Sequence, residues 1–380
     1  MTAPLRWTAE HLSGLAAGDV DRAPVIAASD VSRVDAALDV WDAWPLADGR
    51  GAPVPWRGGE LWFALTAPVL DDPEARHGVA RIHHYHRQNG AFLPLGPTFA
   101  DGFTPGSREW SGSARCDEAG RVTLLFTAAG ERGERALSFR QRLFAADTML
   151  REASDGAAFG AWTNLRELVA PQGEFYLSGH DASGRAGEIK AFRDPALHRT
   201  AQGEEYLLFT ASSARSDSAF NGVIGLARRE ADGRFRRLPP LVDASGTNNE
   251  LERPHIVAHG GLLYLFWSTQ RHVFAPDIFA PGIAAPTGLY GAVASGIEGP
   301  WTLLNGHGLV LANPVCEPFQ AYSWWVLPDL SVASFVDYRG LDDSAAIAKP
   351  AGRAHFGGGF APFLHLALDG PRAGLAQARS

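Results

Sequence analysis

Sulfur-containing residues are scarce in this chain, and long apolar runs are absent. Only two cysteines and two methionines occur among 380 residues. Two cysteines exclude a disulfide-stapled scaffold, and two methionines exclude an adaptable methionine-rich groove. Because Cys116 and Cys316 lie far apart in the sequence, we expect two separate reduced thiols rather than a disulfide. The strongest apolar run, residues 262–267, is strand-sized and far too short to span a membrane as a helix.

The excess of charge of one sign is also small. The chain has 34 Lys and Arg residues against 42 Asp and Glu residues, which gives a net charge of −8. This weakly acidic balance argues against nucleic acids and anionic membranes as partners. The N-terminal stretch lacks the apolar core of a signal peptide, since charged residues recur in it from Arg6 to Asp19. The default expectation is a cytoplasmic protein; secretion by a signal-independent route, or trimming of a longer chain, is the alternative.

Glycine, proline and tryptophan, in contrast, are plentiful. The chain contains 42 Gly, 25 Pro and 11 Trp residues, which is typical of a turn-rich β protein with an aromatic-lined site. Residues 1–35 have the pattern of short helices, and after them apolar residues alternate in short runs bounded by Gly, Pro, Asp and Asn. The clearest predicted strands are 61–66, 80–87, 122–127, 137–144, 189–193, 206–211, 222–228, 256–267, 288–294, 330–338 and 360–368.

The spacing of these runs bounds the fold. Asp232-Gly233 and Gly260-Gly261 predict hairpin turns. No amphipathic helix of the length that a parallel crossover needs recurs between the strands, which weighs against a Rossmann fold or a TIM barrel. The residues therefore predict a single all-β domain over 1–380, with a sandwich, a barrel and a propeller left open.

The first of three acidic motifs is DVWDAWP at residues 39–45, in which Asp42 lies between two tryptophans. Indole rings form the stacking platforms that sugar rings favour, and they shield a carboxylate from water. The plainer interpretation is a surface acid beside two core tryptophans. The motif alone does not separate the two.

The second motif is FRDP at residues 192–195, at the end of a predicted strand. Pro195 holds the residue before it extended, and Arg193 is placed to keep a neighbouring carboxylate ionised. Taken alone, the motif is better explained by an ordinary turn with a surface ion pair.

The third motif is ELERPH at residues 250–255. In a strand, Glu250 and Glu252 would point to the same side. Two like charges at that spacing repel, so one pKa rises unless a cation intervenes, and a raised pKa suits a general acid. Taken alone, a solvated strand face explains the pattern better. A further stretch, SREWSGS at 107–113, offers another indole, a hydroxyl donor and glycine backbone.

Taken together, these motifs resemble glycoside hydrolase family 68, the levansucrases, inulosucrases and bacterial β-fructofuranosidases that act on sucrose. The matching stretches follow the family's order: VWDAWPL (40–46), GSREWSGSA (106–114), AFRDP (191–195), ELERPH (250–255) and, less closely, GLYG (288–291) and QAYSWWVLP (320–328). The resemblance implies a five-bladed β-propeller with a central funnel-shaped active site. Short N-terminal helices in residues 1–35 would pack on it, and no cofactor is expected.

The resemblance also implies roles for individual residues. Asp42 matches the nucleophile, Glu252 the acid/base and Asp194 the transition-state stabiliser. A retaining glycosidase needs two carboxyls roughly 5 Å apart, one to attack the anomeric carbon and one to protonate the leaving oxygen. The covalent fructosyl-enzyme would then pass its sugar to water or to another sugar. The matching pocket residues are Trp41, Trp110, Ser111, Arg193, Glu250 and Tyr322.

Two stretches depart from the family's pattern. Residues 268–272 read STQRH, and Gln270 stands where many levansucrases carry a cation on the acceptor side, with Arg271 or His272 as substitutes. A neutral amide holds an acceptor differently from a cation. We therefore expect a sucrose-hydrolysing β-fructofuranosidase with transfer to short acceptors; the alternative is a levansucrase or inulosucrase that makes fructan polymer. Asn249 replaces an Asp that binds calcium in Gram-positive relatives, so no metal is expected.

Other readings are weaker. His84 and His86 share a strand face, but no third ligand follows at a spacing that zinc requires. A non-catalytic carbohydrate-binding propeller would keep the tryptophans yet tolerate the loss of an acid, and all three acids are present. It is therefore the remote alternative.

Overall fold

The computed structural model describes residues 3–16, 20–151, 156–170, 173–177, 189–278, 285–341 and 352–376. It is built mostly of β-strands, which confirms the all-β expectation. The helices are short: α1 (Ala9–Ser13) and the 3-10 turns η1 (Gly14–Ala16), η2 (Ala28–Asp30), η3 (Pro73–Gly78), η4 (Arg271–Val273), η5 (Pro276–Ile278) and η6 (Leu304–Gly306). In the described residues, no helix is both long and apolar enough to cross a membrane.

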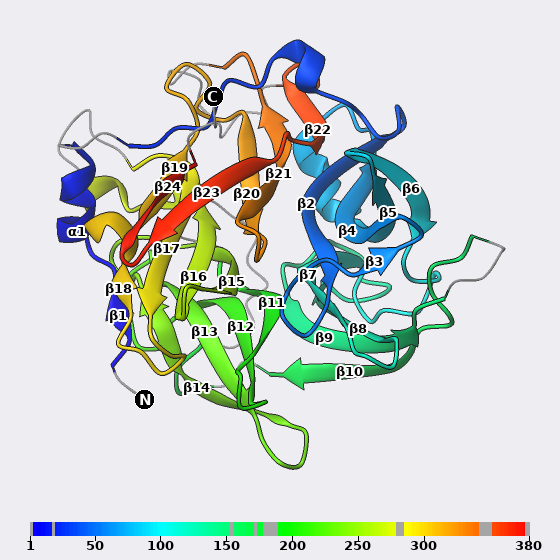
Figure 1. The fold of residues 1–380 in the computed structure, drawn as a ribbon, viewed down its shortest axis with the longest axis horizontal. Helices are drawn as coiled ribbons and strands as arrows, with labels where there is room; N and C mark the ends of the chain where they lie inside the picture. Colours follow the sequence, from blue (N-terminus) through cyan, green and yellow to red (C-terminus); the bar gives the residue numbers. More distant parts are fainter. Residues whose placement is uncertain are drawn as a thin grey trace.

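The described strands fall into five antiparallel units in chain order (Figure 1). The first contains β2 (Leu38–Ala47), β3 (Pro55–Trp56), β4 (Gly59–Pro68), β5 (Arg81–Gln88) and β6 (Ala91–Pro97). The second contains β7 (Arg108–Cys116), β8 (Arg121–Ala129), β9 (Gln141–Met149) and β10 (Thr163–Val169). The third contains β11 (Phe192–Arg199), β12 (Glu205–Ser212), β13 (Gly222–Arg229) and β14 (Phe235–Asp243), with β1 (Leu5–Arg6) paired parallel to β14.

The fourth and fifth units complete the chain. The fourth contains β15 (Glu252–His259), β16 (Leu262–Thr269), β17 (Gly288–Ala294), β18 (Thr302–Leu303) and β19 (Leu309–Ala312). The fifth contains β20 (Ala321–Val326), β21 (Ser331–Tyr338), β22 (Phe356–Phe360), β23 (Leu364–Asp369) and β24 (Arg372–Leu375).

The first strands of the five units lie in a closed circle. β2 contacts β7, β7 contacts β11, β11 contacts β15, β15 contacts β20, and β20 contacts β2 again. Figure 1 shows these strands around the middle of the molecule, with the later strands of each unit outside them. Residues at the same level along these five strands therefore lie around one common centre.

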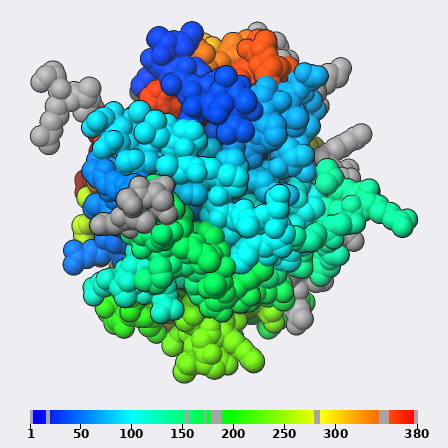
Figure 2. Space-filling view, turned by 90° about the vertical axis from the view of Figure 1, so that its right-hand side faces the viewer, coloured from blue at the N-terminus to red at the C-terminus, as the bar shows by residue number. Residues whose placement is uncertain are grey.

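Described residues of the N-terminal segment pack on the later units. Trp7 is fully buried and packs edge-on against Trp267, with ring centroids 5.4 Å apart. Further along, the Gln320 side chain binds the backbone of Pro24 and Ile26. In Figure 2 the earliest and latest parts of the chain, blue and orange-red, meet at the top of the molecule.

Two local predictions on turns and thiols can be checked directly. Gly260 and Gly261 both have positive φ, 57° and 78°, and connect β15 to β16, which confirms the predicted hairpin turn. Several predicted strand bounds were wrong. The run at 256–267 is divided by that turn, and the run at 360–368 spans the gap between β22 and β23. β9 and β11 begin later than predicted, so FRDP begins a strand and does not end one. Cys116 is buried, Cys316 is exposed, and both are free thiols.

Candidate active site

Each first strand carries a β-bulge at a corresponding position along its length. The register with the next strand shifts between Trp41 and Ala43, Trp110 and Gly112, Arg193 and Ala196, Glu252 and His255, and Tyr322 and Trp325. A bulge inserts an extra residue, bends the strand and re-aims a side chain. The five bulges thus bring one pair of residues from each first strand to the same end of the circle of strands. The second residues of these pairs are Asp42, Ser111, Asp194, Arg253 and Ser323.

Four of the five bulged residues adopt left-handed backbone angles. The φ values are 46° for Asp42, 59° for Asp194, 53° for Arg253 and 61° for Ser323. Such angles are unfavourable for residues other than glycine, and they concentrate at functional sites. The backbone strain falls on two of the three acids that the sequence singled out.

Asp42 and its neighbours form the first part of the site. The Ser111 hydroxyl donates to Asp42 Oδ2 at 2.5 Å, so the two residues meet across the β2–β7 contact as expected. Trp41 is 1% exposed and lies beside them. One carboxylate oxygen of Asp42 is therefore fixed by a hydroxyl.

Arg193 stands between two glutamates. Its Nη2 donates to Glu250 Oε2 at 2.9 Å and to Glu252 Oε1 at 2.7 Å, while its Nε lies 3.8 Å from Asp194 Oδ2. Although burial opposes its charge, the three carboxylates raise the pKa of Arg193. This is the intervening cation that the two closely spaced glutamates require.

Glu252 is held on both sides. Besides Arg193, the Tyr322 hydroxyl donates to its Oε2. Glu250 is not in the same strand, contrary to the expectation, because β15 begins at Glu252. Glu250 lies in the preceding loop, where its backbone N–H donates to Asn248 Oδ1 at 2.7 Å. Burial raises the pKa of Glu250, opposed by Arg193.

Asp194 is buried among donors. Its Oδ2 accepts from the Thr210 hydroxyl at 3.0 Å and from the Arg253 backbone N–H at 3.2 Å. Burial raises the pKa of Asp194 to about 7, and the charges of Glu252 and Asp42 act in the same direction against Arg193. The three predicted acids are thus electrostatic neighbours in one site.

Arg253 ties the circle together, and its role was missed in the sequence. Its Nη1 donates to the Ser323 hydroxyl at 2.7 Å and its Nη2 to the Ala43 carbonyl at 2.7 Å. It therefore joins β15 to both β20 and β2. Thr127 plays a similar part, since its hydroxyl donates to the Ser111 carbonyl and accepts from the Asp194 backbone N–H. Arg253 stood within the ELERPH motif, so the signal was present; nothing in the sequence pointed to Thr127.

A short segment between β4 and β5 forms part of the site's wall and was also missed. Arg76 of η3 lies over the Trp41 ring at 5.4 Å, and the His77 ring contacts the same indole edge-on at 5.8 Å. The Trp110 indole N–H donates to the His77 carbonyl at 3.1 Å. This segment thereby fixes the two predicted aromatic walls, Trp41 and Trp110, against each other.

The STQRH stretch contributes differently from the expectation. Gln270 precedes η4 and is partly buried. Arg271 donates its backbone N–H to Thr287 at 3.0 Å, and its side chain lines a small separate cavity. In the STQRH stretch, the pKa of His272 depends on the acids of the site. Burial lowers this pKa, and the charges of Glu252 and Glu74 oppose that change.

The region around Asn249 is occupied by an ammonium group. Lys190 Nζ donates to the Ala219 carbonyl at 2.6 Å and to Asn221 Oδ1 at 2.9 Å, and lies 3.5 Å from Asn249 Oδ1. Within the described ranges, no group of three or more His, Cys, Asp or Glu side chains is arranged to hold a metal ion. His86, from the weak zinc reading, instead pairs with the Trp56 carbonyl.

Three carboxyls, an arginine and aromatic walls at one end of the strands form a site typical of an enzyme that acts on glycosidic bonds. Comparison with known proteins gives the family. The family model described as levansucrase/invertase matches residues 1–223 and 214–378, so the chain belongs to glycoside hydrolase family 68. It is therefore a glycoside hydrolase or fructosyltransferase, as the motifs predicted.

The relatives cover most of the chain. A levansucrase from Zymomonas mobilis is 30% identical over 374 residues, covering 90% of this chain and 82% of its own length. An extracellular sucrase from the same organism is 29% identical over 368 residues, 88% of this chain and 83% of its own. The solved structure of an inulosucrase from Halalkalicoccus jeotgali bound to kestose is 34% identical, with a TM-score of 0.88 over 99% of this chain and 96% of that one.

Proposed function

We propose that this enzyme transfers the fructosyl unit of sucrose to growing fructan chains, with hydrolysis as the competing reaction. The observation that carries this proposal is the gathering of Asp42, Asp194 and Glu252 at bulges of three of the five first strands, with Arg193 among them. The inulosucrase and levansucrase relatives favour transfer over the hydrolysis-first expectation. The linkage formed depends on acceptor orientation, which this arrangement of acids does not determine.

In the first step, Asp42 attacks the anomeric carbon of the fructosyl unit. The Ser111 hydroxyl holds one carboxylate oxygen, which leaves the other for attack. Glu252 gives its proton to the departing glucosyl oxygen, and Arg193 and the Tyr322 hydroxyl fix its position. Asp194 supplies negative charge to the furanosyl ring as positive charge develops on it.

In the second step, the covalent fructosyl-enzyme reacts with an acceptor. Glu252, now ionised, removes a proton from the incoming hydroxyl. Water as acceptor releases fructose, and a sugar hydroxyl extends a chain. The charge of Glu252 acts on the pKa of His272, so the two side chains are near one another. We assign His272, rather than Gln270 or Arg271, the hydrogen-bonding contact to the acceptor.

The fold supports this assignment as a five-bladed β-propeller in one catalytic domain. The five antiparallel units and the closed circle of their first strands are what five blades around an axis require. The bulges place the acids at one end of that axis, where a funnel would admit sucrose. The compartment in which the enzyme acts stays a prediction; one relative from Zymomonas mobilis is named an extracellular sucrase.

Trapping of the covalent fructosyl-enzyme tests the role assignment. The Glu252→Gln variant, incubated with fructosyl fluoride and quenched in acid, should gain the mass of one fructosyl unit, because fluoride leaves without general-acid help while loss of the base slows breakdown of the intermediate. Peptide mass spectrometry should place the adduct on the peptide that contains Asp42.

The matched control is the double variant Asp42→Asn/Glu252→Gln, which should remain unlabelled and folded by circular dichroism. An adduct on a different carboxylate would contradict the assignment of Asp42.

A further inference from the structure

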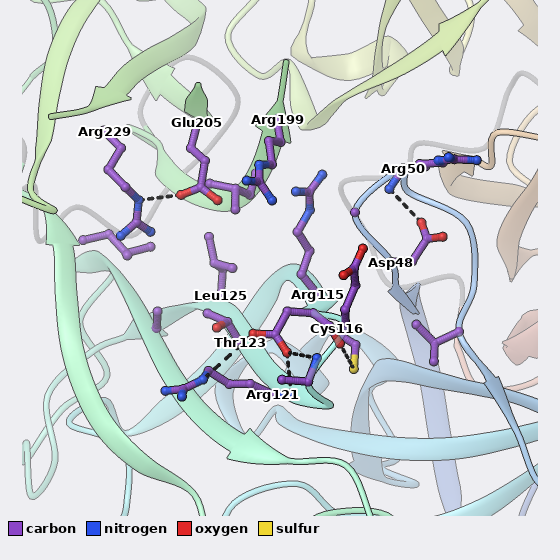
Figure 3. Close-up of a pocket in the computed structure, with 18 of the residues that line it drawn as sticks. Asp48, Arg50, Arg115, Cys116, Arg121, Thr123, Leu125, Arg199, Glu205 and Arg229 are labelled. Atoms are coloured by element: carbon purple, nitrogen blue, oxygen red, sulfur yellow. Dashed lines mark hydrogen bonds and ion pairs between the residues drawn. The ribbon is translucent and has the colours of Figure 1, made fainter. Parts of the chain in front are cut away.

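A second cluster of charge lies at the other end of the first strands. Two cavities, of about 890 and 690 Å³, open there. Gly49, Arg50, Arg115, Leu197 and Arg199 line both. Figure 3 shows the larger cavity, with Arg115 and Arg199 extending toward one another from two different strands. The two cavities therefore meet at three arginines.

Strand geometry separates this cluster from the catalytic acids. Arg115 lies four residues beyond Ser111 on β7, and Arg199 lies five residues beyond Asp194 on β11. At roughly 3.3 Å per residue, these arginines are roughly 13–17 Å from the site along their strands. A ligand bound here would not contact the reacting groups.

The guanidinium groups of these three arginines are unpaired. Within the described parts of the chain, none of the three makes a side-chain hydrogen bond or an ion pair. Two acids of the larger cavity are engaged elsewhere: Glu205 binds Arg229 Nε at 2.6 Å, and Asp48 Oδ1 accepts the backbone N–H of Arg50 at 2.8 Å. The described residues that line the smaller cavity include no Asp or Glu.

Electrostatics inside the cluster points the same way. Burial lowers the pKa of Arg115, and the like charge of Arg199 adds to this, while Glu205 and Asp48 oppose it. Guanidinium groups held close together without a bound carboxylate repel, and an anion between them relieves the repulsion.

A buried imidazole faces the same space. His198 is 9% exposed and lines the smaller cavity with Arg115 and Arg199. Its Nε2 has no hydrogen-bond partner among the described residues. Burial lowers the pKa of His198 to about 4, and Arg115 adds to the effect, so the ring is neutral at pH 7. A neutral imidazole can still donate or accept one hydrogen bond, and a buried polar atom without a partner is rare.

We propose that Arg115, Arg199 and His198 bind the phosphate group of a small molecule at this end of the enzyme. One guanidinium satisfies a carboxylate through two parallel bonds. Two guanidiniums that extend toward one another, beside an imidazole whose Nε2 has no partner among the described residues, instead match the several oxygens and the near-double charge of a phosphate. The smaller cavity, of about 690 Å³, is lined by all three residues and has room for a sugar attached to that phosphate.

Calorimetric titration at constant ionic strength tests this site. The full chain is titrated with inorganic phosphate, ribose 5-phosphate, ribose and sodium chloride. We expect saturable binding of at least one of the two phosphate compounds and none of chloride. Tighter binding of ribose 5-phosphate would identify a sugar phosphate as the ligand class, and tighter binding of inorganic phosphate would identify the free anion.

Paired variants locate the binding. Arg115→Gln/Arg199→Gln should weaken phosphate binding by about tenfold or more, because it removes two charge-assisted contacts. Arg121→Gln is the control: Arg121 lines only the larger cavity, lies 4.0 Å from Asp117 and is exposed, so binding should be unchanged. Sucrose turnover should be the same in all three proteins without phosphate.

The site would be rejected if no phosphate compound bound saturably, or if the double variant bound phosphate as tightly as the parent. If the double variant fails to fold, the single variant Arg199→Gln, at an exposed position, makes the same test.

Discussion

The two ends of the same three strands carry opposite charge. At one end, β2 and β11 present Asp42 and Asp194, and β7 presents Ser111. At the other end, β7 and β11 present Arg115 and Arg199, and the turn after β2 presents Arg50. The strands are shared, so the difference lies in what surrounds the charges.

At the acidic end the three predicted acids and Arg193 all have partners. Arg193 lies among three carboxylates, Ser111 binds Asp42, and Arg253 and Thr210 bind Asp194. Such a site is already balanced and can accept a neutral sugar without reorganising its charges. At the basic end Arg115 and Arg199 have no such partners among the described residues, and for that reason we propose an anion there.

The largest effect is expected from removing a catalytic acid. Asp42→Asn and Glu252→Gln should each lower sucrose turnover by about three orders of magnitude or more, since the first removes the nucleophile and the second removes the acid/base. Initial rates of glucose release measure this. Asp48→Asn is the control and should keep full activity, because Asp48 follows β2 directly and lies at the basic end. If a variant at position 42 or 252 kept near-parent rates, the acidic end would not be the catalytic end.

Stability provides the second test of the comparison. Arg193→Met should cost about 3–5 kcal/mol of unfolding free energy, because it leaves buried carboxylates without their cation. Arg115→Met should change stability by only about 1 kcal/mol or less, since no ion pair is lost. Chemical denaturation of both variants measures the difference. Equal losses would mean that Arg115 has a structural partner equivalent to those of Arg193.

The acids predicted from the sequence were found because each stands in a compact motif with distinctive neighbours. Asp42 lies between tryptophans, and Glu252 two residues after another glutamate. What brings them together could not be predicted, because a bulge depends on the register with the next strand. For the same reason Arg253 was quoted without a role, and Glu250 was placed in a strand that begins two residues later. Arg115 and Arg199 have no motif at all; only the fold makes them neighbours.

The pH dependence of stability should have opposite sign at the two ends. Near the acids, burial raises the pKa of Asp337 to about 8, so the folded chain holds a proton that the unfolded chain releases above about pH 4. This group therefore costs stability as pH rises from about 4 to 8. Asp337→Asn should become progressively more stable than the parent over that window, measured by denaturation at several pH values.

At the basic end, the pKa of His198 is lowered to about 4. The unfolded chain binds a proton below about pH 6.5 that the folded chain does not, so this group costs stability as pH falls from about 6.5 to 4. His198→Gln should gain on the parent over that window. Slopes of the same sign in the two variants would contradict the contrast between the ends.

The smallest effect concerns the acceptor. Removing a hydrogen bond worth ~1 kcal/mol changes the partition between acceptors by about fivefold. His272→Gln should therefore raise the share of free fructose by about that factor, while Gln270→His should lengthen the products. Chromatography of products from sucrose checks both. An unchanged product ladder in both variants would place the acceptor contact elsewhere.

The most direct test of the central claim is the release of glucose and free fructose from sucrose over time by the unmodified chain. Fructosyl transfer predicts glucose in clear excess over fructose, with the missing fructose recovered as fructan. A chain that releases no glucose from sucrose, yet degrades inulin or an arabinan, would contradict the proposed function.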